Sequence, residues 1–209
     1  LSERKGGWMT VQVASQGLSV QGRPLFLQAG VFHYFRLPHR DLWRPALTRL
    51  RLSGFNAVVL PIPWAYHSPA PGFYDFTGPR DLESLMGVIE EVGLWSIPHL
   101  GPWVGSRLDA GGIPAWIFRS AGMAPGCEAG AASISHPLRR HLSAWWSHLF
   151  KVFQGREHVL FLMLDPGRCA NGAFPQGMRA VLVELVEALG RGMPWSFLDM
   201  SGSGTPTSN

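Results

Sequence analysis

Short apolar segments and stretches of helical periodicity alternate along most of the chain. In the clearest helical stretch, residues 81–92, the apolar residues Leu82, Leu85, Met86 and Ile89 recur at the three- and four-residue spacing of one helix face. Apolar and polar residues do not alternate within the apolar segments, and such continuous apolar runs are typical of strands buried on both faces of a parallel sheet. We therefore predict an α/β fold, with strands at 25–35, 57–64, 95–102, 159–164 and 194–200 and helices at 41–53, 81–92, 137–153 and 178–189.

This alternation fits two parallel architectures, the doubly wound sheet and the barrel, and periodicity does not separate them. A nucleotide-binding doubly wound fold would usually carry a Gly-rich phosphate loop after a strand, and no predicted strand is followed by one. In both architectures functional residues gather at the carboxyl ends of the strands. The candidate residues are therefore expected at those ends.

Composition and charge narrow the class of protein. The chain has 209 residues, 46% of them hydrophobic and nine of them Trp, which suits one folded domain with a real core. The net charge is +4, but the arginines are scattered over the predicted helices, so we expect no nucleic acid partner. Cys127 and Cys169 lack the spacing of metal ligands, and we expect no metal and no cofactor.

The two ends of the chain carry little patterning. No apolar run approaches the roughly 18 residues of a membrane span, and the start has no signal-peptide core, so we expect a soluble protein without a membrane partner. The sequence does not indicate in which cellular compartment the protein acts. The Ser/Gly/Thr-rich residues 201–209 predict a disordered tail, and a start without Met suggests a fragment or a processed chain.

Aromatic and polar residues gather where the predicted strands end. Such a mixture fits a sugar site, because pyranose faces stack on rings and hydroxyl groups need fixed donors and acceptors. The alternative is that the rings pack in the core, which is the commoner role of Trp and Tyr at such positions, and His33 has the same alternative as a buried histidine. The residues predicted to contact a sugar are Tyr34, Trp64, Trp103, Arg107, Asp109 and Trp116.

Carboxyl groups are scarce at these ends. Glycoside hydrolysis usually needs two of them across the scissile bond, and only Asp109, Asp165 and Asp199 lie near predicted strand ends, with no glutamate among them. Asp165 is the candidate acid. An aspartate at a site built for glutamate displaces the proton donor, and a misplacement of about 1 Å can lower the rate on the order of 100-fold.

An ordered series of motifs gives the chain a family resemblance. The series holds His-Tyr-x-Arg-x-Pro, Trp-x-x-His-x-Pro and Gly-x-x-Asp-Phe-x-Gly-x-x-Asp-Leu motifs, and residues 30–95 closely resemble the opening of glycoside hydrolase family 35, the β-galactosidase family. The matching residues are His33, Tyr34, Arg36, Pro38, Trp43, Gly54, Asn56, Trp64, His67, Pro69, Gly72, Asp75, Phe76, Gly78, Asp81, Leu82, Gly101, Pro102, Gly111, Gly112, Pro114 and Trp116.

The resemblance implies a (β/α)8 TIM barrel, of which this chain supplies about five of the eight β/α units. It divides the chain into a lead-in at 1–21, a partial barrel at 22–200 and the tail at 201–209. It implies a galactoside-like carbohydrate as partner. It also implies that the chain needs the missing C-terminal half of the barrel, because five strands leave two open sheet edges.

The departures from the family pattern fall where its chemistry lies. The resemblance places the family's sugar-binding Glu at Arg107, its substrate-contacting Tyr at Pro61, and its acid/base Glu, with the preceding Asn, at Gly167 and Pro166. Glycine has no group to protonate a leaving oxygen. The family's nucleophile would lie beyond Asn209.

These features leave several functional hypotheses. The first is a carbohydrate-active domain related to β-galactosidases whose catalysis is impaired or lost, either as a glycan-binding surface or as a scaffold. The alternative is an active retaining exo-β-glycosidase that uses Asp165 as a shifted acid, with a nucleophile from a missing C-terminal half. A third is a truncated product that does not fold stably. The simultaneous change of three site positions favours lost catalysis over an active enzyme.

Overall fold

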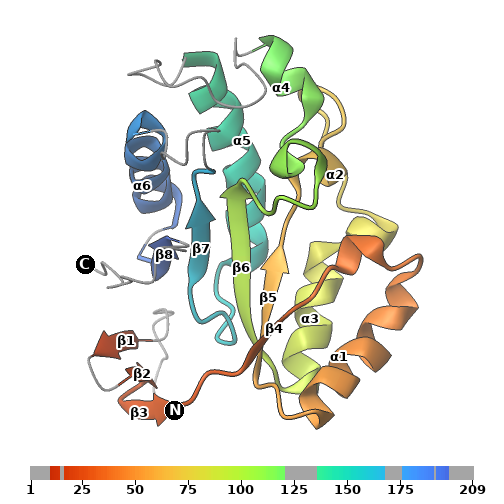
Figure 1. Cartoon of the computed structure of the whole chain (residues 1–209), viewed down its shortest axis with the longest axis vertical. Helices are drawn as coiled ribbons and strands as arrows, with labels where there is room; N and C mark the ends of the chain where they lie inside the picture. The colour runs from red at the N-terminus through yellow and green to blue at the C-terminus, as the bar shows by residue number, and fades with distance from the viewer. Residues whose placement is uncertain (1–9, 15–16, 121–135, 168–175, 191, 198–209) are drawn as a thin grey trace, which may run out of the picture.

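The computed structural model describes residues 10–14, 17–120, 136–167, 176–190 and 192–197, and Figure 1 shows their arrangement. Five parallel strands form one sheet in the order β4-β5-β6-β7-β8, so every strand lies beside its neighbours in the chain. A doubly wound sheet would reverse this order partway, whereas a barrel winds in one direction. The strands are β4 (Ala29–Val31), β5 (Ala57–Pro61), β6 (Trp95–Pro102), β7 (Leu162–Asp165) and β8 (Trp195–Phe197).

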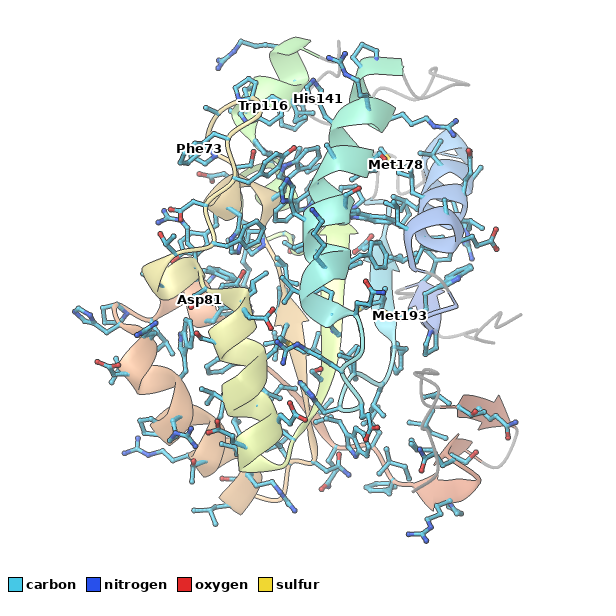
Figure 2. The ribbon with its side chains drawn as sticks, turned by 180° about the vertical axis from the view of Figure 1, so that it is seen from behind. Phe73, Asp81, Trp116, His141, Met178 and Met193 are labelled. Carbon is cyan, nitrogen blue, oxygen red and sulfur yellow. The ribbon has the colours of Figure 1, made fainter. Side chains whose placement is uncertain are left out.

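The predicted helices are all present and cover one face of this sheet (Figures 1 and 2). Short helices and single turns follow the carboxyl ends of the strands. The long helices are α1 (Trp43–Leu52), α3 (Leu82–Val92), α5 (His136–Phe153) and α6 (Gln176–Gly190), and the short ones are α2 (Trp64–His67), α4 (Ala115–Ser120), η1 (Tyr34–Arg36), η2 (Arg40–Leu42), η3 (Gly78–Arg80) and η4 (Asp109–Gly112).

Helix α3 shows how local sequence sets these boundaries. The Asp81 carboxylate accepts a hydrogen bond from the Ser84 backbone N–H over 2.9 Å, which satisfies one of the free N–H groups of the first turn. The helix ends at Gly93, whose φ of 76° is left-handed and favours glycine. The periodic residues between these caps are buried, so the predicted helix is confirmed.

The amino-terminal region differs from the prediction. Residues 10–25 form a separate antiparallel sheet of β1 (Val11–Ala14), β2 (Gly17–Val20) and β3 (Arg23–Leu25), in the order β1-β2-β3. Gln21 and Gly22 join β2 to β3 with φ of 50° and 74°, the left-handed pair of a tight hairpin turn. The predicted strand 25–35 is therefore wrong in extent, because its first residue belongs to this hairpin and Tyr34 already turns into η1. Residues 201–209 lie outside the described part.

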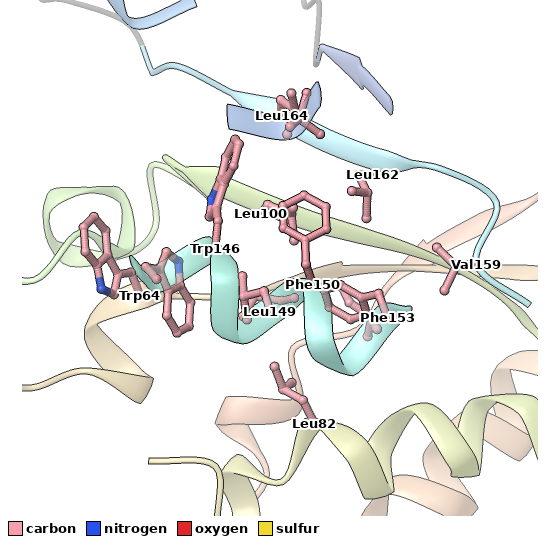
Figure 3. Packing of buried hydrophobic residues seen from close by; sticks show 14 of the residues in the cluster. Trp64, Leu82, Leu100, Trp146, Leu149, Phe150, Phe153, Val159, Leu162 and Leu164 are labelled. Carbon is pink, nitrogen blue, oxygen red and sulfur yellow. The ribbon is translucent and has the colours of Figure 1, made fainter. Parts of the chain in front are cut away.

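The core has two parts, one on each face of the parallel sheet. Helix α5 fills the larger part, with Trp146, Leu149 and Phe150 packed against Leu100 and Leu162 of the strands (Figure 3). The opposite face holds a smaller cluster, which consists of Val20, Ala57, Ile97 and Leu160 with Val11, Leu25 and Leu27 packed against it. The small sheet thus covers apolar side chains at the amino-terminal end of the strands.

Candidate functional site

Three of the aromatic residues predicted to contact a sugar are packed inside the protein. Tyr34 is 0% exposed, Trp64 1% and Trp116 6%. The Trp64 ring stacks on Trp145 of α5 with centroids 6.1 Å apart and the planes 2° from parallel. Trp116 donates from Nε1 to the Ser68 carbonyl over 2.9 Å and meets the His141 ring edge-on (Figure 2). Rings enclosed in this way act as packing residues and support the loops above them.

A buried Tyr–His pair lies beneath these loops. The Tyr34 hydroxyl donates to His67 Nε2 over 2.6 Å, and His67 Nδ1 donates to the Asp75 carbonyl over 2.9 Å, so the ring is neutral with its proton on Nδ1. Burial lowers the His67 pKa to about 4, against a smaller rise caused by the hydrogen bond to Asp75. The pair connects the segment after β4 to the segment after β5. The family motif contains both residues, but their contact is visible only in the fold.

Trp103 is the predicted aromatic residue that stays partly exposed. It follows β6 directly, and its side chain packs against two glycines of positive φ, Gly111 at 65° and Gly167 at 78°. A Cβ atom on Gly111 would lie 2.2 Å from Trp103 Cδ2, and one on Gly167 would lie 3.3 Å from Trp103 Cβ. The position of the indole therefore depends on glycine at both places.

Asp165 and Gly167 stand together at the end of β7. The Gly167 N–H donates to Asp165 Oδ1 over 2.8 Å, and the Trp103 N–H donates to the Asp165 carbonyl over 3.2 Å. Gly167, the position expected for the acid/base, thus takes part in a tight turn that holds the Asp165 carboxylate. Asp199 and Arg168, the other polar residues at predicted strand ends, lie outside the described residues.

Arg107 and Asp109 are exposed in the loop between β6 and α4. A turn closed by the bond from Leu108 N–H to the Gly105 carbonyl, 3.2 Å long, places Arg107 at its tip. Arg107 lies close enough to His33 to lower its pKa, after the larger effects of burial and of Arg36.

His99 is a polar residue of this region that the sequence analysis missed. It lies in β6 opposite Pro61 of β5 and Met163 of β7. It is 5% exposed, its Nε2 has no hydrogen-bond partner among the described residues, and burial lowers its pKa to about 4 against a smaller rise from a hydrogen bond with the Trp103 backbone. The signal in the sequence was one histidine inside an otherwise apolar strand.

Among the described residues, no group of three or more His, Cys, Asp or Glu side chains is arranged to hold a metal ion. Across the same residues, no helix combines the length and the apolar character needed to cross a membrane.

Solved structures share this arrangement of strands and helices. An exo-beta-1,4-mannosidase, Op5Man5 from Opitutaceae bacterium strain TAV5, has a TM-score of 0.63 at 14% sequence identity, over 94% of this chain and 34% of that one. A GH5_18 protein from Streptomyces cattleya, in complex with GlcNAc, has a TM-score of 0.59 at 16% identity, over 82% of this chain and 44% of that one. At such identities the likeness shows the fold alone, an incomplete TIM barrel of α/β units.

Relatives at higher identity cover part of the chain. Beta-galactosidase-1-like protein 2 of Homo sapiens is 34% identical over 113 residues, 54% of this chain and 18% of the relative. The beta-galactosidase of Mus musculus is 40% identical over 97 residues, 46% of this chain and 15% of the relative. A probable beta-galactosidase B of Aspergillus fumigatus is 32% identical over 145 residues, 69% of this chain and 13% of the relative.

The matched part of the chain thus spans less than a fifth of each of these relatives. The model of glycosyl hydrolases family 35 matches residues 17–155, which is more than half of the chain. The match contains the motifs from His33 to Trp116 on which the resemblance rests and extends over β2 and β3. The chain belongs to the glycosyl hydrolases of family 35.

Proposed function

We propose that this chain is a β-galactosidase-related domain that binds carbohydrate at the carboxyl ends of its strands without hydrolysing it. The observation that carries the proposal is the conformation at Gly167, where the family resemblance places the acid/base. The residue has no side chain to donate a proton, and its φ of 78° is one that side chains rarely adopt. Hydrolysis would therefore need another acid.

Asp165 is a poor replacement for that acid. Its Oδ1 already accepts a hydrogen bond from the Gly167 N–H over 2.8 Å, so this oxygen has a partner within the chain. The carboxylate is also held within its own turn by this bond. Both features favour a structural role for Asp165 in keeping the end of β7 tight.

Trp103 is the proposed platform for the sugar. It is the predicted aromatic residue that stays partly exposed, and it follows β6 in the loop that also carries the exposed Arg107 and Asp109. A ring face with polar groups around it is the usual composition of a sugar site.

Hydrolysis of a chromogenic β-galactoside separates the proposal from the enzymatic alternative. We expect no release of the chromophore above the background of buffer at any concentration of the chain. Release that disappears in Asp165→Ala would overturn the proposal and establish Asp165 as the shifted acid. Asp41→Ala, which changes an exposed carboxylate of η2, is the matched control in that case.

Galactose binding, followed by calorimetry, tests the sugar platform. Gly111→Ala forces the Trp103 indole to move, because the new Cβ would lie 2.2 Å from the ring. We therefore expect Gly111→Ala to weaken galactose binding by at least as much as Trp103→Ala does. Gly72→Ala is the control, since Gly72 also has a left-handed φ of 72° but nothing lies within 4 Å of an added Cβ. Equal binding by Gly111→Ala and Gly72→Ala would exclude Trp103 as the platform.

We also propose that further strands complete the barrel. Within the described residues, β4 and β8 are the edges of the parallel sheet, and Val31 of β4 is 56% exposed. Unpaired edges and exposed apolar side chains lower the stability of a sheet. A fusion of residues 1–209 to the remaining β/α units of a family 35 barrel should therefore melt at a higher temperature and more cooperatively than residues 1–209, and equal melts would contradict this.

A further inference from the structure

Three histidines are buried in the described part of the chain, and they differ in what their ring nitrogens contact. His67 has a hydrogen-bond partner at each nitrogen. His158 lies with its Nδ1 3.5 Å from Glu90 Oε2. His99 is 5% exposed, and its Nε2 has no hydrogen-bond partner among the described residues. Since buried polar atoms in native proteins are almost always hydrogen-bonded, the partner of this nitrogen is expected outside the described residues.

The strand register places His99 on the face of the sheet opposite α5. His99 pairs with Pro61 of β5 and with Met163 of β7, and paired residues of neighbouring strands carry their side chains on the same face. Met163 and Val59 pack with the small apolar cluster of that face, whereas Leu100, the residue after His99, packs under the helices. The His99 ring therefore points toward the interior of the barrel.

This face is partly exposed near the carboxyl ends of the strands. Along β7, Met163 and Asp165 lie on it and are partly exposed, whereas Leu162 and Leu164 on the other face are buried. His99 lies at the level of Met163. Methionine is unbranched and flexible, so this neighbour of His99 can move aside for a ligand.

A β-bulge separates His99 from Trp103. The pairing of β6 with β7 shifts register between His99 and Gly101, and bulges redirect side chains and are common next to active sites. A hydrogen bond with the Trp103 backbone raises the pKa of His99, so the ring donates in this bond and, with Nε2 unpartnered, does so through Nδ1. In the neutral ring Nε2 is then an acceptor, which suits a hydroxyl group as donor.

We infer that His99 Nε2 accepts a hydrogen bond from a hydroxyl group of a neutral sugar, whose ring stacks on Trp103 four residues farther along the chain. The inference rests on the proposed function and deepens it by naming a second binding residue and the group that it recognises. The neighbours of His99 on this face, Val59, Pro61 and Met163, are apolar, so the orientation of the sugar at this level of the sheet depends on the histidine.

Two replacements of His99 separate the roles of its ring nitrogens. The amide of Asn reaches the position of Nδ1 but not that of Nε2, whereas the amide of Gln reaches that of Nε2. We expect His99→Asn to weaken galactose binding to the full chain about ten-fold, the order of one hydrogen bond, and His99→Gln to weaken it less. Calorimetry measures the binding, and circular dichroism melts show that each variant is folded.

His158→Asn is the matched control. His158 is also buried, but it precedes β7 and its carbonyl accepts from the Ser96 N–H at the start of β6, so it lies at the amino-terminal ends of the strands. Ligands of barrels bind at the opposite ends. The change should therefore leave galactose binding as it is in the unchanged chain.

Galactose derivatives that each lack one hydroxyl group identify the group that His99 binds. We expect one derivative to bind the unchanged chain about ten-fold more weakly than galactose does, because Nε2 stays without a partner. The same derivative should bind His99→Asn as tightly as galactose does, because that variant has already lost the acceptor. Such non-additivity marks a direct contact between the hydroxyl group and the side chain.

The possible failures are distinguishable. Equal galactose binding by His99→Asn and His158→Asn, or equal losses for every derivative in both chains, overturns the inference and leaves the Trp103 platform standing. A His99→Asn chain that melts at a lower temperature yet binds galactose normally, or two His99 variants that fail to fold, would assign the histidine to the fold and also overturn the inference. Absence of galactose binding by the unchanged chain overturns both the inference and the proposed function.

Discussion

Replacing Tyr34 with phenylalanine removes one buried hydroxyl group and leaves the ring in place. The hydroxyl donates to His67 Nε2 over 2.6 Å, and both side chains are 0% exposed. Because His67 Nδ1 already donates to the Asp75 carbonyl, Nε2 must be an acceptor. In Tyr34→Phe this acceptor stays buried and loses its donor.

The expected loss of unfolding free energy follows from that geometry. A buried polar atom left without its partner costs about 1–3 kcal/mol, whereas the phenyl ring keeps the edge contacts of Tyr34 with Phe35 and Tyr66. The packing contribution should therefore change little. Against a total stability of about 5–15 kcal/mol for a typical domain, the loss should be readily measured.

Urea unfolding followed by circular dichroism measures this loss, with Tyr66→Phe as the matched control. The Tyr66 hydroxyl is only partly buried, and it reaches the Pro79 carbonyl over 3.4 Å, so its removal should cost less than about 0.5 kcal/mol. If Tyr34→Phe costs no more than Tyr66→Phe, the Tyr–His pair does not stabilise the fold and the reasoning is refuted.

Three further predictions concern the core and the caps. His67 and His99 have pKa values lowered to about 4 in the folded protein, so their contribution to stability is full above the unfolded value of about 6.5 and is lost as the pH falls from there to 4. For each of the two histidines we expect the free energy of unfolding to fall by up to about 3 kcal/mol, measured by urea unfolding at several pH values. Asp81→Ala removes the cap of α3 and should cost about 1 kcal/mol in the same measurement. Trp145→Ala removes the ring that stacks on Trp64 and should cost about 3–5 kcal/mol.

Each of these has a contradicting outcome. A stability that stays constant between pH 6.5 and 4 would mean that the two histidines keep access to water in the folded state. An unchanged Asp81→Ala variant would show that solvent replaces the cap. If Trp145→Ala lowers the free energy of unfolding no more than Phe73→Ala, which changes an exposed residue, then α5 does not pack as described.

Local patterning determined most of the secondary structure and the family. Helix α3 could be predicted because its apolar spacing, its Asp81 cap and its terminal Gly93 all act within one segment. The ordered motifs predicted the family for the same reason, since they depend only on residue identity and spacing. The expectation that the family's sugar-binding glutamate aligns with Arg107 rests on the same motifs.

Tertiary structure decided which of the predicted residues can meet a ligand. Trp64 and Trp103 both follow strand ends, yet the first is enclosed by Trp145 of α5 and the second packs against Gly111 and Gly167 and stays partly exposed. The contacts that bury or expose a ring come from segments far away in the chain, and periodicity carries no information about them. The sequence by itself therefore determined the elements and the family, and only the packing between distant segments decided the site.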